Sequence, residues 1–103
     1  IVLDEPESGL DFKNQLVVLN QLKALAGKGV SVIFNTHYPE HALSFSDKAL
    51  MLFGKGTGRH LFGKTEEVVT EKSIGECFSV EAKIVTVDMG DTELRTVIPV
   101  KLL

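Results

Sequence analysis

Two short apolar runs decide the fold: Ile1-Val2-Leu3, which precedes Asp4-Glu5-Pro6, and Val30-Ser31-Val32-Ile33-Phe34, which precedes Asn35-Thr36-His37. Both runs are too short and too rich in β-branched residues to favour helices, and each stops at polar residues or proline. We therefore expect two strands, the second of them buried, that end at candidate functional side chains.

The segment between the two runs predicts a helix. Asp11 suits its N-cap, and Gly27 and Gly29 suit its end. Apolar residues recur every three or four positions, as on a buried helix face. They are Phe12, Leu16, Leu19, Leu22 and Ala26. Strand, helix and strand in this order form a βαβ unit, whose strands run parallel with a right-handed crossover.

Parallel strands place their C-terminal ends at one edge of the sheet, so Asp4, Glu5 and His37 should share an edge. Ligands of open α/β sheets bind outside that edge. Strand order alone therefore nominates these three residues as a candidate site.

The remainder of the chain predicts short elements and two hairpins, giving an α/β fold class overall. We expect a helix that starts at Pro39, followed by a strand at 48–53 that pairs with 59–63 across a turn at Gly54-Lys55-Gly56. Helical turns should follow at 65–69 and 70–78. The chain should end in a hairpin of 82–87 and 95–100, with Pro99 at an edge or end of the sheet.

Composition limits the classes of protein. The 103 residues form one domain at most, and a domain of this size can depend on a partner for stability. A net charge of −3 disfavours nucleic acid as a partner. No apolar run approaches the roughly 20 residues of a membrane span, and the single Cys77 permits no internal disulfide, as in cytosolic proteins. Because the sequence opens on Ile1 inside a strand-like run, we expect it to be part of a longer chain.

Adjacent acids in an arbitrary loop are usually solvated, but Asp4 and Glu5 follow an apolar run. This arrangement resembles the Walker B strand of P-loop ATPases, in which one carboxylate faces hydrated Mg²⁺ and the next polarises a water for in-line attack on the γ-phosphate of ATP. Asp4 is then the metal candidate and Glu5 the general base.

The nine residues Leu3-Asp4-Glu5-Pro6-Glu7-Ser8-Gly9-Leu10-Asp11 resemble the Walker B and D-loop string of ABC ATPases, and Asn35-Thr36-His37 resembles their switch region. The resemblance implies that Glu5 and His37 are catalytic, with His37 contacting the γ-phosphate and helping to position the water. It also implies that the D-loop faces the opposite subunit and belongs to the nucleotide site. Its residues are Ser8, Gly9, Leu10 and Asp11.

The same resemblance implies the C-terminal half of a P-loop NTPase (RecA-like) parallel sheet core with flanking helices, residues 1–80, and a terminal β-hairpin extension, residues 81–103. Residues 11–15 and 36–42 are most similar to importers of iron-siderophore, haem or cobalamin. Membership implies ATP and Mg²⁺ as cofactors, an ABC transporter membrane subunit and a second nucleotide-binding subunit in a homodimer as partners, and a cytoplasmic location on the inner face of the cell membrane.

The sequence departs from the family in two ways. Glu7 stands where threonine is usual, and we expect little effect on hydrolysis. The glycine-rich P-loop and the signature motif should precede Walker B, where this chain has no residues. We therefore expect these 103 residues alone to be inactive and to self-associate or exchange strands, covering an open sheet edge.

Three other interpretations stay open. A chromosome-maintenance or repair ATPase shares a similar string but carries coiled-coil insertions between its halves. An iron–sulfur assembly ATPase also has a Thr-His-Tyr string, although Pro6 and the Asn14-Gln15 helix start disfavour it. The third is a non-enzymatic, self-associating fragment.

Several residues imitate functional motifs. Residues 58–65 satisfy the bare P-loop pattern, but Leu61 and Phe62 are bulky and suit a strand, with Gly63 in a turn and Thr65 as an N-cap. The His37 and His41 pair has helical spacing, yet no third zinc ligand stands out nearby. We expect His60 on a strand surface and Cys77 as a small core residue.

Overall fold

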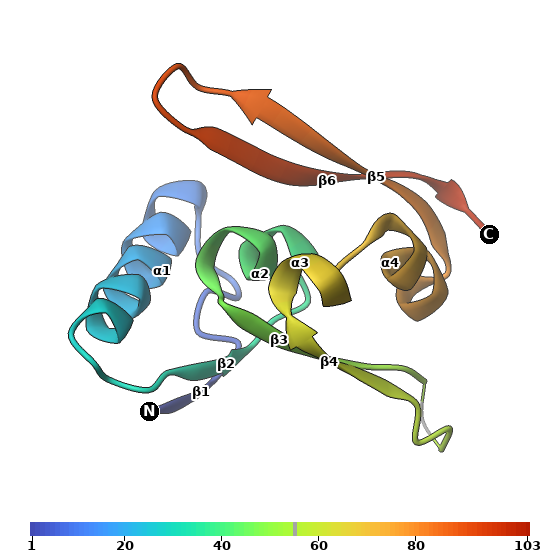
Figure 1. The fold of residues 1–103 in the computed structure, drawn as a ribbon, viewed down its shortest axis with the longest axis horizontal. Coiled ribbons are helices and arrows are strands. Elements are labelled where there is room, and N and C mark those ends of the chain that lie inside the picture. Colours follow the sequence, from blue (N-terminus) through green and yellow to red (C-terminus); the bar gives the residue numbers. More distant parts are fainter. Residues whose placement is uncertain (55) are drawn as a thin grey trace. The chain divides into compact units, whose positions relative to one another are not determined.

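The computed structural model describes residues 1–54 and 56–103, which form four helices and three two-stranded sheets (Figure 1). They divide into two compact units, Ile1–Tyr38 and Pro39–Leu103. Lys55, in the expected turn after the third strand, lies outside the described residues. The expected boundary between residues 80 and 81 stays a prediction.

The first unit contains the predicted βαβ arrangement. Strand β1, Val2–Asp4, pairs in parallel with β2, Ile33–Asn35, and helix α1, Phe12–Gly27, connects them. The register places Val2 opposite Ile33 and Asp4 opposite Asn35. The second strand is shorter than the expected 30–34 and begins at Ile33, because its partner strand begins at Val2.

Helix α1 begins as predicted and buries less than predicted. The Asp11 carboxylate accepts a hydrogen bond from the Asn14 amide at 2.9 Å, which confirms the N-cap. Leu19 and Leu22 are buried, whereas Phe12 is 88% exposed. The unit offers only two three-residue strands, which are too small to cover a whole face of a 16-residue helix. The expected burial of the second strand was also wrong at Ile33, which is exposed.

The chain leaves β1 through a strained turn. Glu5 has φ +43°, a left-handed conformation that side chains with a Cβ rarely adopt. Glycine usually fills such positions, and Gly9 does so later in the same turn with φ +75°. The backbone at Glu5 therefore carries strain next to the predicted Walker B carboxylate.

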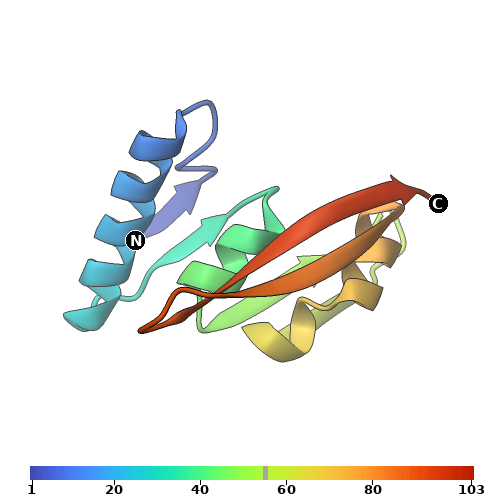
Figure 2. The same cartoon turned by 90° about the horizontal axis from the view of Figure 1, so that it is seen from above.

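The second unit consists of short helices and two antiparallel hairpins. The elements are α2 (Pro39–Phe45), β3 (Lys48–Leu52), β4 (His60–Lys64), α3 (Thr65–Val68), α4 (Glu71–Phe78), β5 (Val80–Asp88) and β6 (Glu93–Leu102). Figure 2 shows β5 and β6 side by side along their length, and they pack on α4 and α2, respectively. The predicted parallel sheet is thus confined to the first unit, while both predicted hairpins are confirmed.

A single apolar core holds the second unit together. Its buried members come from both hairpins and from the helices and links between them. They are Leu43, Met51, Phe53, Val68, Val69, Ile74 and Ala82. The partly buried Cys77 packs against this cluster and its thiol lies 3.4 Å from the Leu52 carbonyl oxygen, in agreement with a core role. Burial raises the pKa of the Cys77 thiol, which favours the uncharged form.

Two local expectations require correction and two are confirmed. Lys64 occupies the N-cap of α3, so Thr65 is its first residue, where the buried hydroxyl bonds the Ser46 carbonyl at 3.1 Å. Gly63 lies within β4 opposite Ala49 and not in a turn. The stretch that imitates a P-loop is largely strand β4, and His60 is exposed on that strand, as expected. Pro99 lies in β6 of a two-stranded sheet, opposite a register shift in β5, which agrees with its expected position at an edge.

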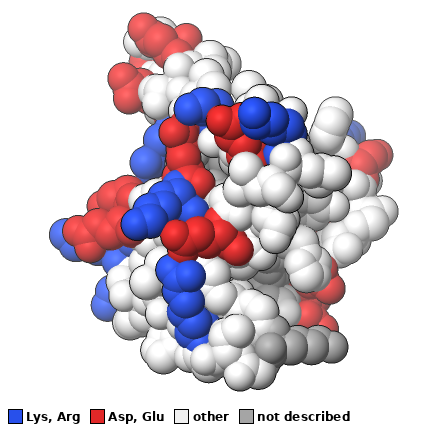
Figure 3. All heavy atoms as spheres, turned by 90° about the vertical axis from the view of Figure 1, so that its right-hand side faces the viewer, with Lys and Arg blue, Asp and Glu red and all other residues white. Residues whose placement is uncertain are grey.

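Charged side chains of the second unit form ion pairs at its surface. Arg59 pairs with Glu76, Lys83 with Glu71 at 3.8 Å, and Lys101 with Glu81 at 3.9 Å. On the face in Figure 3, acidic and basic side chains are interspersed. Exposed pairs of this kind contribute about 0–1 kcal/mol each. In the part of the chain that the structure describes, no helix is both long and apolar enough to cross a bilayer.

We predict that Gly75→Ala destabilises the protein. A Cβ at Gly75 in α4 would lie 3.0 Å from the Val80 carbonyl oxygen, a backbone atom at the start of β5. The overpacking should cost about 1–3 kcal/mol, against a gain of about 1 kcal/mol in helix propensity. Urea unfolding should show a net loss, while the exposed Lys72→Ala control in the same helix should change little. A more stable Gly75→Ala would contradict the contact.

We also predict that Glu5→Gly is more stable than Glu5→Ala, by about 1 kcal/mol, because alanine keeps the strained left-handed backbone. At ordinary positions the order is reversed, and the exposed Glu66 of α3 provides that control in the same urea measurement. If alanine were more stable than glycine at position 5, as it should be at position 66, the backbone at Glu5 would not be strained.

Candidate functional site

The parallel pairing of β1 and β2 brings the two predicted motifs together. Asp4 and Asn35 form the last residue pair of the sheet, so both strands end at the same edge, as predicted. Immediately beyond it, the Glu5 amide donates a hydrogen bond to the Asn35 Oδ1 at 2.6 Å. This bond ties the turn after β1 to the end of β2 and sets the direction in which both chains leave the sheet.

Glu5 and His37 meet at this edge. His37 Nε2 lies 3.0 Å from Glu5 Oε1, and the two side chains are 77% and 36% exposed. An ion pair this open to solvent contributes about 1 kcal/mol or less. Both side chains can therefore exchange this contact for a ligand at little cost. The arrangement places a carboxylate and an imidazole within reach of the same bound group, as acid–base chemistry requires.

Asp4 is exposed at the end of β1, where a metal could approach it. In the residues described, no three His, Cys, Asp or Glu side chains are grouped to hold a metal ion. Mg²⁺ is commonly held by one or two carboxylates, with waters and substrate phosphates as the other ligands. Asp4 suits an ion of that type.

The D-loop residues lie in an exposed turn between β1 and α1. Ser8, Gly9, Leu10 and Asp11 are all exposed, and the Ser8 amide donates to the Glu5 carbonyl at 3.1 Å. Asp11 has a clear local task, because its carboxylate caps α1. All four residues therefore lie at the surface, and Asp11 is also fixed to the start of the helix.

Sequence reasoning missed a structural role for Glu7. Its side chain is completely buried, and its Oε2 accepts a hydrogen bond from the Thr36 hydroxyl at 2.8 Å. An acidic residue in a turn is normally solvated, so nothing in the sequence indicated this contact. The expectation that glutamate in place of threonine has little effect on hydrolysis stays a prediction, and this buried contact argues against it.

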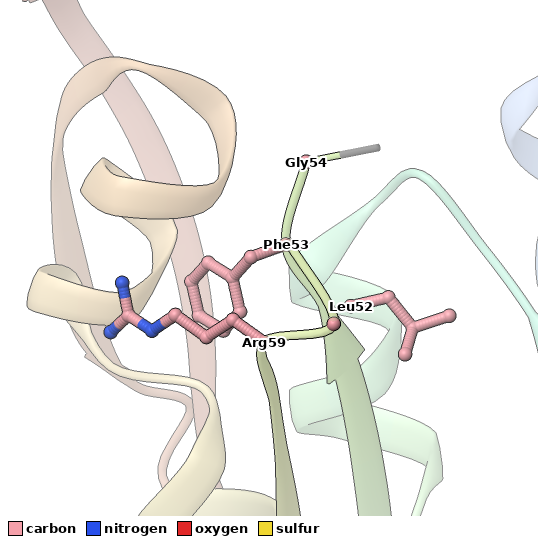
Figure 4. A pocket seen from close by; sticks show the side chains of 5 residues that line it. Leu52, Phe53, Gly54 and Arg59 are labelled. Carbon is pink, nitrogen blue, oxygen red and sulfur yellow. The ribbon is translucent and has the colours of Figure 1, made fainter. Parts of the chain in front are cut away.

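A shallow pocket of about 440 Å³ in the second unit offers no comparable chemistry. Among the described residues that line it, Arg59 is charged, and its guanidinium carbon lies 4.3 Å from the centre of the Phe53 ring (Figure 4). The same guanidinium pairs with Glu76. Because this cation is already engaged by a ring and a carboxylate, the edge of the β1–β2 sheet is the better candidate site.

Comparison with known proteins points to one family. No family model matches the chain. The chain is 35% identical over 79 residues to the molybdate import ATP-binding protein MolC of Haemophilus influenzae. The aligned stretch covers 76% of this chain and 30% of the relative. The chain is 34% identical over 85 residues to the hemin import ATP-binding protein HmuV of Hahella chejuensis, covering 82% and 32%, respectively. The vitamin B12 import ATP-binding protein BtuD of Vibrio campbellii is 30% identical over 88 residues, covering 85% and 34%.

A solved structure agrees with these relatives. It is an inward-facing conformation assigned to a metal-chelate type ABC transporter, 28% identical, with a TM-score of 0.87 over 97% of this chain and 39% of that one. The chain spans about a third of the length of the curated relatives it matches. Over that span, it belongs to the ABC transporter ATP-binding proteins.

Proposed function

We propose that this chain supplies the hydrolytic edge of an ATP-hydrolysing importer subunit. The observation that carries the proposal is the Glu5–His37 pair, a carboxylate and an imidazole 3.0 Å apart where two parallel strands end. The named relatives are import proteins for molybdate, hemin and vitamin B12, which favours transport over chromosome maintenance or iron–sulfur assembly. Among cargoes, we infer a metal chelate of the iron-siderophore, haem or cobalamin type.

Each site residue has a distinct proposed role. Asp4 would hold Mg²⁺, which supplies positive charge to the phosphates of bound ATP. Glu5 would accept a proton from the attacking water, and His37 would orient that water and contact the γ-phosphate. Positioning of this kind, together with electrostatic stabilisation of the phosphates, is how a protein accelerates phosphoryl transfer.

The proposed setting includes other subunits. Ser8, Gly9, Leu10 and Asp11 would face a second nucleotide-binding subunit, and an ABC membrane subunit would receive the conformational change. In this setting the protein would work on the cytoplasmic face of the membrane. For the 103 residues alone, we propose no ATP turnover, because the matching P-loop and signature motif are absent from them.

The test is Glu5→Gln in the full-length protein. The amide keeps the shape of the side chain but cannot act as a base, so steady-state ATP turnover should fall about 100-fold or more while equilibrium ATP binding is retained. Glu66→Gln, an exposed acid in α3, is the matched control and should turn over ATP normally. Unchanged turnover in Glu5→Gln would sink the catalytic assignment.

A further inference from the structure

We propose that Glu7 is a positioning residue for His37, acting through the hydroxyl of Thr36. The proposal rests on the catalytic role proposed for Glu5 and His37 and adds a residue that the motif resemblance leaves without a task. Glu7 lies two residues after Glu5 in the turn, and Thr36 immediately precedes His37. A bond between them therefore joins the two segments that carry the catalytic side chains.

The Thr36 hydroxyl holds the chain on both sides of His37. It donates to the buried Glu7 Oε2 at 2.8 Å, and it accepts a hydrogen bond from the Tyr38 amide at 3.1 Å. The residues before and after His37 are thus anchored to one oxygen atom. That oxygen is in turn fixed to a side chain that is completely buried.

The exposed contact between His37 and Glu5 cannot by itself hold His37 in a fixed position. His37 is 77% exposed, and ion pairs in solvent hold their side chains weakly. The acceptor of the Thr36 hydroxyl is completely buried, so water does not compete for this hydrogen bond. The position of His37 therefore depends on two hydrogen bonds, one between Glu7 and Thr36 and one between the Glu5 amide and Asn35.

The two bonds form successive ties between the same segments. One joins Glu5 to Asn35 and the other joins Glu7 to Thr36, so the two segments stay tied together beyond the last pair of the sheet. Loss of the second tie should let the His37 backbone move relative to Glu5 without opening the sheet. Small displacements of a catalytic group reduce the rate of the chemical step more than they reduce binding.

The experiment is a double-mutant cycle in the full-length protein, with kcat and KM for ATP measured for Glu7→Ala, Thr36→Val and the double variant. We expect each single variant to lower kcat about 10-fold with KM within about two-fold, and the double variant to be no worse than either. Glu7→Gln, whose amide oxygen can accept from Thr36, and Thr36→Ser, which keeps the hydroxyl, should both recover most of the rate.

Several outcomes would overturn the proposal. These are a full kcat in folded Glu7→Ala, additive losses in the double variant, or failure of both Glu7→Gln and Thr36→Ser to recover the rate. If Glu7→Ala does not fold, Thr36→Val, which preserves side-chain volume, decides the matter through its own kcat and recovery by Thr36→Ser. Glu5→Gln separates the two hypotheses. If its ATP turnover is unchanged, the proposed function fails, whereas a strongly reduced turnover of Glu5→Gln beside a fully active Glu7→Ala removes only the positioning role.

Discussion

The parallel pairing of β1 with β2 is the constraint on which the candidate site depends. The sheet is only three residue pairs long, yet its last pair, Asp4 with Asn35, determines where both chains leave it. A shift of one residue would turn the side chains of one strand to the opposite face and would separate the Glu5 amide from Asn35. Because Glu5 and His37 follow directly, their 3.0 Å contact is a consequence of this register.

The site combines local strain with weak side-chain contacts. Glu5 holds φ +43° and its amide is hydrogen-bonded to Asn35, whereas its carboxylate is partly exposed and the His37 ring is largely exposed. The Glu5 backbone can stay strained while the Glu5 and His37 side chains remain free to move, because the surrounding backbone is fixed by the hydrogen bond between the buried Glu7 and Thr36. A site of this kind presents its reactive groups in a defined direction while leaving them able to engage a ligand.

Much of this organisation was predictable from the sequence. Polar residues after two β-branched runs, with a capped helix between them, indicated the shared strand edge, and the motif resemblance named Asp4, Glu5 and His37. Helix burial was less predictable, because Phe12 and Leu16 have the spacing of a buried face but the unit has too little sheet to cover them. The role of Glu7 could not be anticipated at all, since its hydrogen bond to Thr36 joins residues that are 29 positions apart in the chain.

The most direct test of this account is a crystal structure of the full-length protein with Mg²⁺ and a non-hydrolysable ATP analogue. The account predicts that Asp4 faces the metal, that Glu5 keeps its left-handed backbone with its amide bonded to Asn35, and that Glu5 and His37 flank the γ-phosphate position. A nucleotide bound away from this edge, or Glu5 and His37 turned apart with the phosphate held elsewhere, would contradict the central claim.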